Sequence, residues 1–187
     1  MVGFPSDPIV LAGGVGYYRG FISPQEADDL FAAFLKFEWR QHILQATGPD
    51  SPLYVWMGIP CDLLNSANKI MVAEWTPEAE HLKLLVEEKT GCTFDSLEMN
   101  LYRDHRDSLG FDSGRKEAGK LSFPIASVSL GAERRVRWTN INDESTTTQL
   151  LEHGSLVLMP PSFRCDHRFE MPKQEKLCGP RINLTFG

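Results

Sequence analysis

The chain has 187 residues, of which 42% are hydrophobic and 24% are charged. That length supports one sizeable core and the composition is ordinary for a soluble globular protein, so we expect a single domain over residues 1–187. The formal net charge is −6, and residues 1–95 hold six Lys and Arg against 13 Asp and Glu. Because this half of the chain is acidic, it repels phosphates and disfavours general affinity for nucleic acid.

The sequence also bears on where the protein resides. No apolar run approaches the length of a membrane span, and the first residues, MVGFPSDP, lack the basic-then-apolar form of a signal peptide. The four cysteines, Cys61, Cys92, Cys165 and Cys178, include no C-x-x-C pair, so we interpret them as free thiols in a reducing compartment. We therefore expect an intracellular protein, cytoplasmic or nuclear, with no membrane partner.

Two helices are predicted in the first half of the chain. The S-P-Q-E run at residues 23–26 is a capping box with Pro at the first helical position, and it opens a helix over about 24–37. The T-P-E run at residues 76–78 starts a second helix that continues to the stop signal at Gly91. Both helices carry an apolar stripe, as a helix that packs on a core requires.

From residue 96 the apolar period shortens to that of a strand. Strands are predicted at 97–103, 123–130, 134–140, 149–152, 155–159 and 181–186. Several short strands behind two helices predict an α+β fold, with a β-sandwich or jelly roll supported by helices.

The last predicted strand carries an arginine on its polar face. Arg181, Asn183 and Thr185 share one face, and the apolar alternates share the other. If the apolar face packs on the helices, the polar face points into the barrel, where an arginine is costly without an anionic partner. That partner is a protein carboxylate in the simpler interpretation and a bound ligand carboxylate in the other.

Several ordered blocks of this sequence resemble the AlkB family of iron- and 2-oxoglutarate-dependent dioxygenases. The resemblance runs from about residue 14 to the end, and its blocks lie at residues 17–27, 100–104, 107–110, 124–132, 153–160 and 179–186. It implies a double-stranded β-helix, a jelly-roll core over about 96–187, with an N-terminal helical or lid extension over about 1–95 that recognises the substrate. Members of the family oxidise methyl groups on nucleic-acid bases or on proteins.

The family holds iron on two histidines and one carboxylate, and the matching positions differ here. The H-x-D pair, usually within G-W-H-x-D, corresponds to Asp112 and Gly114, and the second histidine, three residues before a proline, corresponds to Phe169. Glycine has no side chain and phenylalanine has no lone pair, so one carboxylate remains. We therefore expect no iron and no catalytic residue.

A relocated metal site is the alternative to this interpretation. His105 and Asp107 form an H-x-D pair, and His167 lies at a plausible distance for a distal ligand. The flanking blocks fix the register without a gap, which places His105 in a turn, as an ordinary surface histidine. His167 shares the face of Phe169 only if no bulge intervenes.

The co-substrate positions are partly retained. Asn100 and Tyr102 match residues that hydrogen-bond 2-oxoglutarate in the family, and Arg181 matches the arginine that pairs with its distal carboxylate. A second arginine of the family corresponds to Gly187. Two interpretations stay open: a remnant pocket that binds 2-oxoglutarate or another carboxylate weakly, or a polar network that keeps the barrel closed.

Substrate recognition is altered as well, because Arg115 and Lys116 follow the H-x-D position where repair enzymes of the family carry acidic residues. The lid segment 51–58 is apolar and aromatic, either a core strand or a surface for a protein partner.

We expect a catalytically inactive pseudoenzyme that binds a protein partner. The alternatives are an active oxygenase with relocated ligands, drawn from Asp112, His105 and His167, and a non-catalytic nucleic-acid-binding protein. The latter would use Arg103, Arg106, Arg115, Lys116 and the cluster at 134–137.

Overall fold

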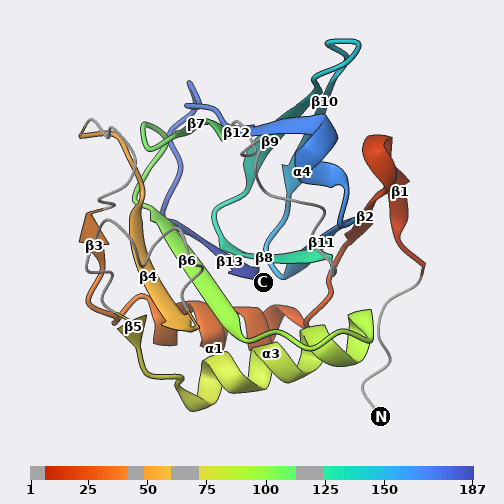
Figure 1. Ribbon diagram of the computed structural model, residues 1–187. Coiled ribbons are helices and arrows are strands. Elements are labelled where there is room, and N and C mark those ends of the chain that lie inside the picture. The colour runs from red at the N-terminus through yellow and green to blue at the C-terminus, as the bar shows by residue number, and fades with distance from the viewer. Residues whose placement is uncertain (1–6, 42–48, 60–71, 113–123) are drawn as a thin grey trace.

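The structure is a computed structural model, and it describes residues 7–41, 49–59, 72–112 and 124–187. Two β-sheets face each other, and two helices cover the outer face of the larger sheet (Figure 1). Within the described residues, no helix is long and apolar enough to cross a membrane.

The larger sheet has nine strands in the order β1-β2-β11-β8-β13-β6-β4-β3, with β5 paired to β4. All pairs are antiparallel except β4 with β5. Its strands are β1 (Ile9–Leu11), β2 (Val15–Tyr18), β3 (Arg40–Gln41), β4 (Leu53–Gly58), β5 (Val72–Ala73), β6 (Ser96–Tyr102), β8 (Ile125–Gly131), β11 (Ser155–Met159) and β13 (Arg181–Phe186).

The smaller sheet has four antiparallel strands in the order β10-β9-β12-β7. They are β7 (Leu109–Asp112), β9 (Arg134–Asn140), β10 (Thr146–Leu151) and β12 (His167–Met171). From β6 onward the chain passes back and forth between the two sheets, which is the winding of a jelly roll. The predicted fold class is confirmed.

The two predicted helices are present and are capped as the sequence indicates. In α1 (Pro24–Phe34) the Ser23 hydroxyl accepts a hydrogen bond from the Glu26 N–H, and in α3 (Pro77–Thr90) the Thr76 hydroxyl accepts one from Ala79. Gly91 ends α3 with a φ of 69°, a left-handed conformation that glycine adopts without strain. The first helix ends at Phe34, three residues before the predicted end.

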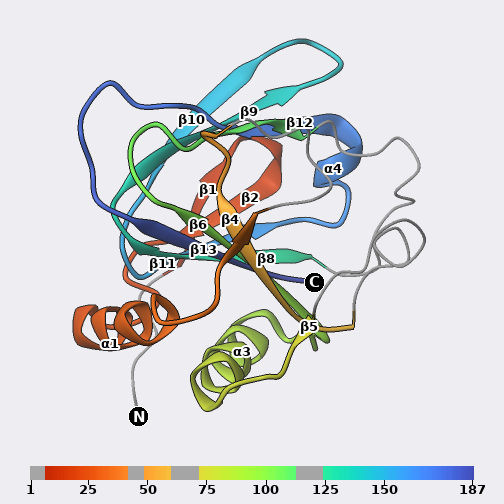
Figure 2. The ribbon, with the colours of Figure 1, turned by 90° about the vertical axis from the view of Figure 1, so that its left-hand side faces the viewer.

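Two separate cores result from this layering. One lies between the helices and the larger sheet, and Figure 2 shows α1 and α3 side by side against that sheet. It contains Ile182, Leu184 and Phe186, so the apolar face of β13 packs on the helices as predicted. The second core lies between the two sheets and is rich in aromatic side chains. It occupies the interior where the sequence places the family's reactive centre.

Short elements account for most of the differences from the predicted structure. The helical turns η1 (Ala12–Gly14) and α4 (Phe163–Asp166) and the strands β1, β2, β3, β5, β7 and β12 were not predicted. By contrast, β9, β11 and β13 have the predicted bounds.

The segment at 51–58 forms β4, in which Tyr54 and Trp56 are only 4% and 9% exposed. The core-strand interpretation is therefore correct, and the surface interpretation of these two side chains is wrong.

Candidate functional site

The polar residues predicted to line the barrel come together on two neighbouring strands. Asn100 on β6 lies opposite Asn183 on β13, and Tyr102 lies opposite Arg181. Asn100, Tyr102 and Arg181 are all buried, with exposed fractions of 8%, 2% and 0%. The structure thus places the three co-substrate positions on one inward face, next to Ser127 and Ser129 of β8.

Arg181 is a buried cation that is only partly satisfied. Its Nη2 atom donates to the Ser129 hydroxyl at 2.9 Å and to the Asn183 side-chain oxygen at 3.0 Å. Its Nε and Nη1 atoms are buried without a hydrogen-bond partner. Burial lowers the pKa of Arg181 to about 10, so the side chain is still protonated at neutral pH. None of the described carboxylates forms an ion pair with it, so the simpler sequence interpretation of its partner finds no support there.

Tyr102 lies within cation–π distance of two buried guanidinium groups. Its ring centroid is 5.5 Å from the guanidinium carbon of Arg181 and 5.6 Å from that of Arg134. The ring face attracts both cations, which offsets part of the cost of burying them. Burial raises the pKa of Tyr102 to about 12, so the phenol stays neutral beside these cations.

Arg134 belongs to the cluster at 134–137 that the nucleic-acid alternative would use, but the structure places it in the interior. It is fully buried, and its guanidinium donates to the backbone carbonyls of Asp104, Asp107 and Pro172 at 2.8–2.9 Å. The sequence does indicate this burial. Successive side chains of a strand point to opposite faces, so Arg134 lies on the same face as the buried Val136 and Trp138. Arg134 therefore joins two loops to β9 inside the molecule.

The opposite wall of the barrel is aromatic. Asp112 on β7 lies opposite Phe169 on β12, Phe169 lies opposite Trp138 on β9, and Trp138 lies opposite Thr147 on β10. These four positions form one row across the smaller sheet. Two of the three predicted iron-ligand positions, Asp112 and Phe169, are thus paired neighbours, whereas Gly114 lies outside the described residues.

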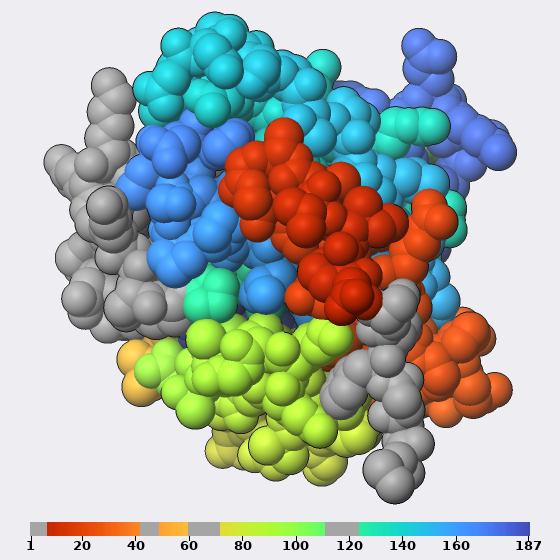
Figure 3. Space-filling model, turned by 90° about the vertical axis from the view of Figure 1, so that its right-hand side faces the viewer, coloured from red at the N-terminus to blue at the C-terminus, as the bar shows by residue number. Residues whose placement is uncertain are grey.

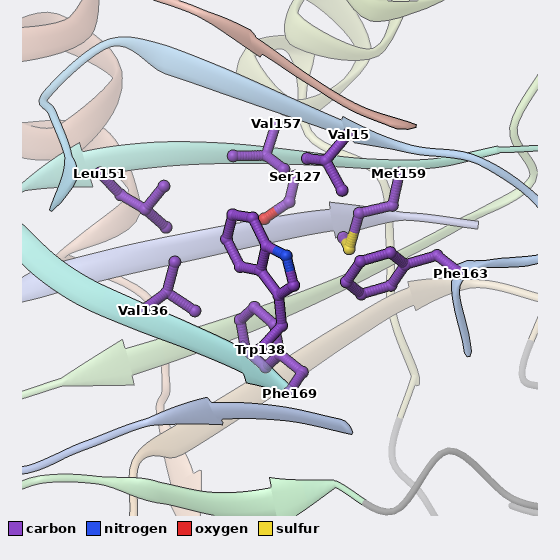
Figure 4. Close-up of a pocket in the computed structure, with 9 residues that line it drawn as sticks. All are labelled: Val15, Ser127, Val136, Trp138, Leu151, Val157, Met159, Phe163 and Phe169. Atoms are coloured by element: carbon purple, nitrogen blue, oxygen red, sulfur yellow. The ribbon is translucent and has the colours of Figure 1, made fainter. Parts of the chain in front are cut away.

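A small apolar cavity lies beside this row. Its volume is about 10 Å³, close to the minimum for one water molecule. Figure 4 shows the Trp138 indole and the Phe163 ring projecting toward the cavity, and the two ring centroids are 6.1 Å apart in an edge-to-face arrangement. The Trp138 Nε1 atom is buried without a hydrogen-bond partner. The lining residues are Val15, Ser127, Val136, Trp138, Leu151, Val157, Met159, Phe163 and Phe169.

The structure does not assemble the relocated H-x-D site. Both carboxylate oxygens of the buried Asp107 accept hydrogen bonds from the Arg103 guanidinium, at 2.8 Å each. The His105 side chain is only 23% exposed, so it is partly buried rather than the surface histidine that we expected. Its backbone oxygen accepts a hydrogen bond from Gln174, beyond the Met171 end of β12.

His167 begins the same strand at the opposite end. It lies opposite Asn140, four residues from Met171, so about 13 Å of strand separates it from the turn that holds His105. The irregularity in β12 falls after Phe169, so His167 and Phe169 do point to the same face. The His167 ring stacks on Phe163 with centroids 4.6 Å apart and planes 2° from parallel. His167 is therefore part of the aromatic packing.

These contacts test whether iron fits the site. Among the described residues, no group of three or more His, Cys, Asp and Glu side chains is close enough to hold a metal ion. At the predicted ligand position on β12, Phe169 borders an apolar cavity. Of the three predicted ligand positions, only Phe169 has a described side chain, and phenylalanine offers no donor atom to Fe(II). The cavity beside Phe169 is too small for 2-oxoglutarate and is not lined by Arg181, the residue that offers the charge a carboxylate would need.

Comparisons with known proteins support the fold and the sequence resemblance. Residues 14–186 match the family model described as the 2OG-Fe(II) oxygenase superfamily. The chain is 31% identical over 185 residues to mouse (Mus musculus) alpha-ketoglutarate-dependent dioxygenase alkB homolog 3, covering 90% of this chain and 64% of that protein. It is 32% identical over 120 residues to DNA oxidative demethylase ALKBH2 of Bos taurus, covering 60% of this chain and 43% of that protein.

A solved structure extends the agreement to the fold. The structure of OsALKBH1 aligns with a TM-score of 0.67 and 16% identity, covering 94% of this chain and 98% of that one. The chain spans a little under two thirds of the length of the curated relatives that match it over most of its residues.

Proposed function

Because this chain belongs to the 2OG-Fe(II) oxygenase superfamily, among its AlkB-like members, we propose that it keeps the fold without the oxidation chemistry and acts as a non-catalytic binding or regulatory protein. The observation that carries this proposal is the pairing of Phe169 with Asp112 and Trp138 at the heart of the smaller sheet. Phe169 stands where the family has its second histidine, and the rings of Phe169 and Trp138 supply no lone pairs to a metal. The tight packing of these rings favours a stable core over an open reaction chamber.

The same interior argues for weak binding of 2-oxoglutarate at most. Arg181 has two unpartnered nitrogen atoms, but the neighbouring Asn183 and Ser129 already occupy its Nη2 atom. The cavity of about 10 Å³ beside Phe169 cannot hold a five-carbon dicarboxylate unless side chains move, and Arg181 is not among the residues that line it. We infer that the polar network of β6, β8 and β13 chiefly maintains the closed barrel.

The first prediction concerns metal content and turnover. Protein purified in the presence of Fe(II) should contain far less than one iron per chain, and it should convert no 2-oxoglutarate to succinate above the background of the assay. Elemental analysis and succinate detection measure the two quantities, with the mouse relative as the positive control for turnover. Stoichiometric iron together with succinate formation would overturn the proposal.

We propose a protein as the binding partner, because most of the described arginines that the nucleic-acid alternative would use are paired with a carboxylate or buried, Arg135 being the exposed exception. Arg103 is paired with Asp107, Arg106 with Asp104, and Arg137 with Glu170, and Arg134 is buried. Arg115 and Lys116 lie outside the described residues. An arginine already paired with a carboxylate releases fewer counterions from a phosphate backbone.

Oligonucleotide binding provides the second prediction. Single-stranded and duplex DNA should show no saturable binding between low and physiological salt, because the acidic first half of the chain repels the phosphates. Fluorescence anisotropy over a salt series measures this. A binding constant that falls steeply and linearly with log salt would instead favour the nucleic-acid alternative, for which the name of the ALKBH2 relative is the main support.

A further inference from the structure

The strand β10 is an edge strand without the usual protection against pairing. It ends the smaller sheet and contacts β9 on one side, in a continuous six-residue register without a bulge. The cyan atoms of the β9–β10 hairpin stand at the top rim of the molecule in Figure 3. The sequence of β10, TTTQLL, contains no charge, no Pro and no Gly. Natural sheets usually protect an edge with one of these devices or by keeping the strand short.

The other strands at sheet ends in the described structure are shorter. β1 has three residues, β3 and β5 have two each, and β7 has four, whereas β10 has six. Threonine is β-branched and favours an extended backbone. β10 is therefore the longest open edge among these strands.

Backbone geometry shows which groups of β10 face outward. The Asn140 N–H donates to the Ser145 carbonyl, so this pair is hydrogen-bonded across the hairpin. Hydrogen-bonded residues alternate along an antiparallel strand, so the backbone groups of Thr147, Gln149 and Leu151 also bond to β9. The N–H and C=O groups of Thr146, Thr148 and Leu150 consequently point away from β9. The Gln149 side-chain amide donates to the Leu150 carbonyl at 2.7 Å.

We propose that β10 is a self-association surface, in which two copies of this chain pair β10 with β10 antiparallel about a two-fold axis at Thr148. Residues opposite each other across an antiparallel pair point to the same side of the sheet, so Thr148 faces its own copy and Thr146 faces Leu150 of the second copy. The three outward-facing residues of each copy then form hydrogen-bonded pairs. Two four-stranded sheets become one continuous sheet.

The charges around β10 permit a second copy as the occupant. The chain has a net charge of −6, so copies repel one another in general, but β10 itself is uncharged. The nearest carboxylates at its two ends would face each other in the pair, and both are already neutralised. Glu144 pairs with Arg168 at 2.8 Å, and Glu152 pairs with Arg19 at 3.0 Å. The β10 edge thus offers an approach without like-charge repulsion.

Sedimentation over a concentration series tests this surface. The native protein should show a reversible monomer–dimer equilibrium, and Thr148→Pro should raise the dissociation constant by about tenfold or more, because it removes the N–H on the axis. Thr148→Val keeps that N–H and the β-branched shape, so it should dimerise like the native chain. Far-UV circular dichroism establishes that each variant is folded.

A second variant keeps the test decisive if the proline substitution disturbs the fold. Thr148→Lys places two like charges across the axis at an exposed position, and it should weaken the dimer to a similar degree. A native protein that remains monomeric up to about millimolar concentration overturns the proposal and leaves the edge to a partner of another sequence. A dimer that survives both Thr148→Pro and Thr148→Lys overturns it equally.

Discussion

The triple variant Asp112→His, Gly114→Asp and Phe169→His should bind one Fe(II) per chain, whereas the native protein should bind none. The backbone already pairs position 112 with position 169 across β7 and β12. Imidazoles at these two positions and a carboxylate at 114 would recreate a two-histidine, one-carboxylate donor set with open coordination positions. Histidine is smaller than phenylalanine, so the substitution at 169 demands no extra space beside the 10 Å³ cavity.

The measurement is metal content after dialysis, supported by the absorption spectrum of a Co(II) or Fe(II) complex. The matched control is the double variant that retains Phe169. Loss of an outer partner of a ligand typically costs about 10–100-fold in metal affinity, so loss of a direct ligand should cost more than that. If the folded triple variant takes up no more metal than this control, position 169 is not a ligand position and the register inferred for β12 is wrong.

The parts of the fold that were predicted correctly are those whose signals are local. Ser23 and Thr76 predict where their helices begin, because a capping hydrogen bond joins residues only three positions apart. β13 has the predicted bounds and the predicted faces, because its alternation of polar and apolar residues is complete within six residues. The resemblance supplied the jelly-roll topology, which pairs strands distant in the chain and is not encoded by any single segment.

The missed parts depend on partners far away in the sequence. β2 is a strand because Tyr17 lies opposite Val157, a pairing across most of the chain, and its four residues carry no strong local pattern. The partial burial of His105 likewise arises from a loop that returns near Gln174. The aromatic row is clear only once β9 and β12 are paired, since nothing in the sequence alone brings Trp138 to Phe169.

The candidate site also has a part that could be predicted from the sequence and a part that could not. The positions Asn100, Tyr102 and Arg181 could be selected by family resemblance, and their mutual placement follows from the β6–β13 register. The small size of the cavity beside Phe169 could not be foreseen. It results from the packing of Trp138 and Phe163 side chains, which periodicity does not specify.

Arg134→Leu should lower the free energy of unfolding by about 4 kcal/mol, because hydrogen bonds from a charged donor contribute about 1.5–3 kcal/mol each. Arg134 donates to three backbone carbonyls, those of Asp104, Asp107 and Pro172, and the apolar surface gained by leucine offsets part of the loss. Two loops, one between β6 and β7 and one between β12 and β13, would lose their shared anchor on β9.

Urea unfolding followed by tryptophan fluorescence measures this effect, and the adjacent residue supplies the control. Arg135 is exposed on the other face of β9, so Arg135→Leu should change stability by no more than about 0.5 kcal/mol. Arg134→Lys should also be destabilising, because a single ammonium group cannot reproduce the planar donor geometry that reaches three carbonyls. Equal stability of Arg134→Leu and Arg135→Leu would mean that the buried guanidinium contributes no net stability, and its cost of desolvation would then match the hydrogen bonds it makes.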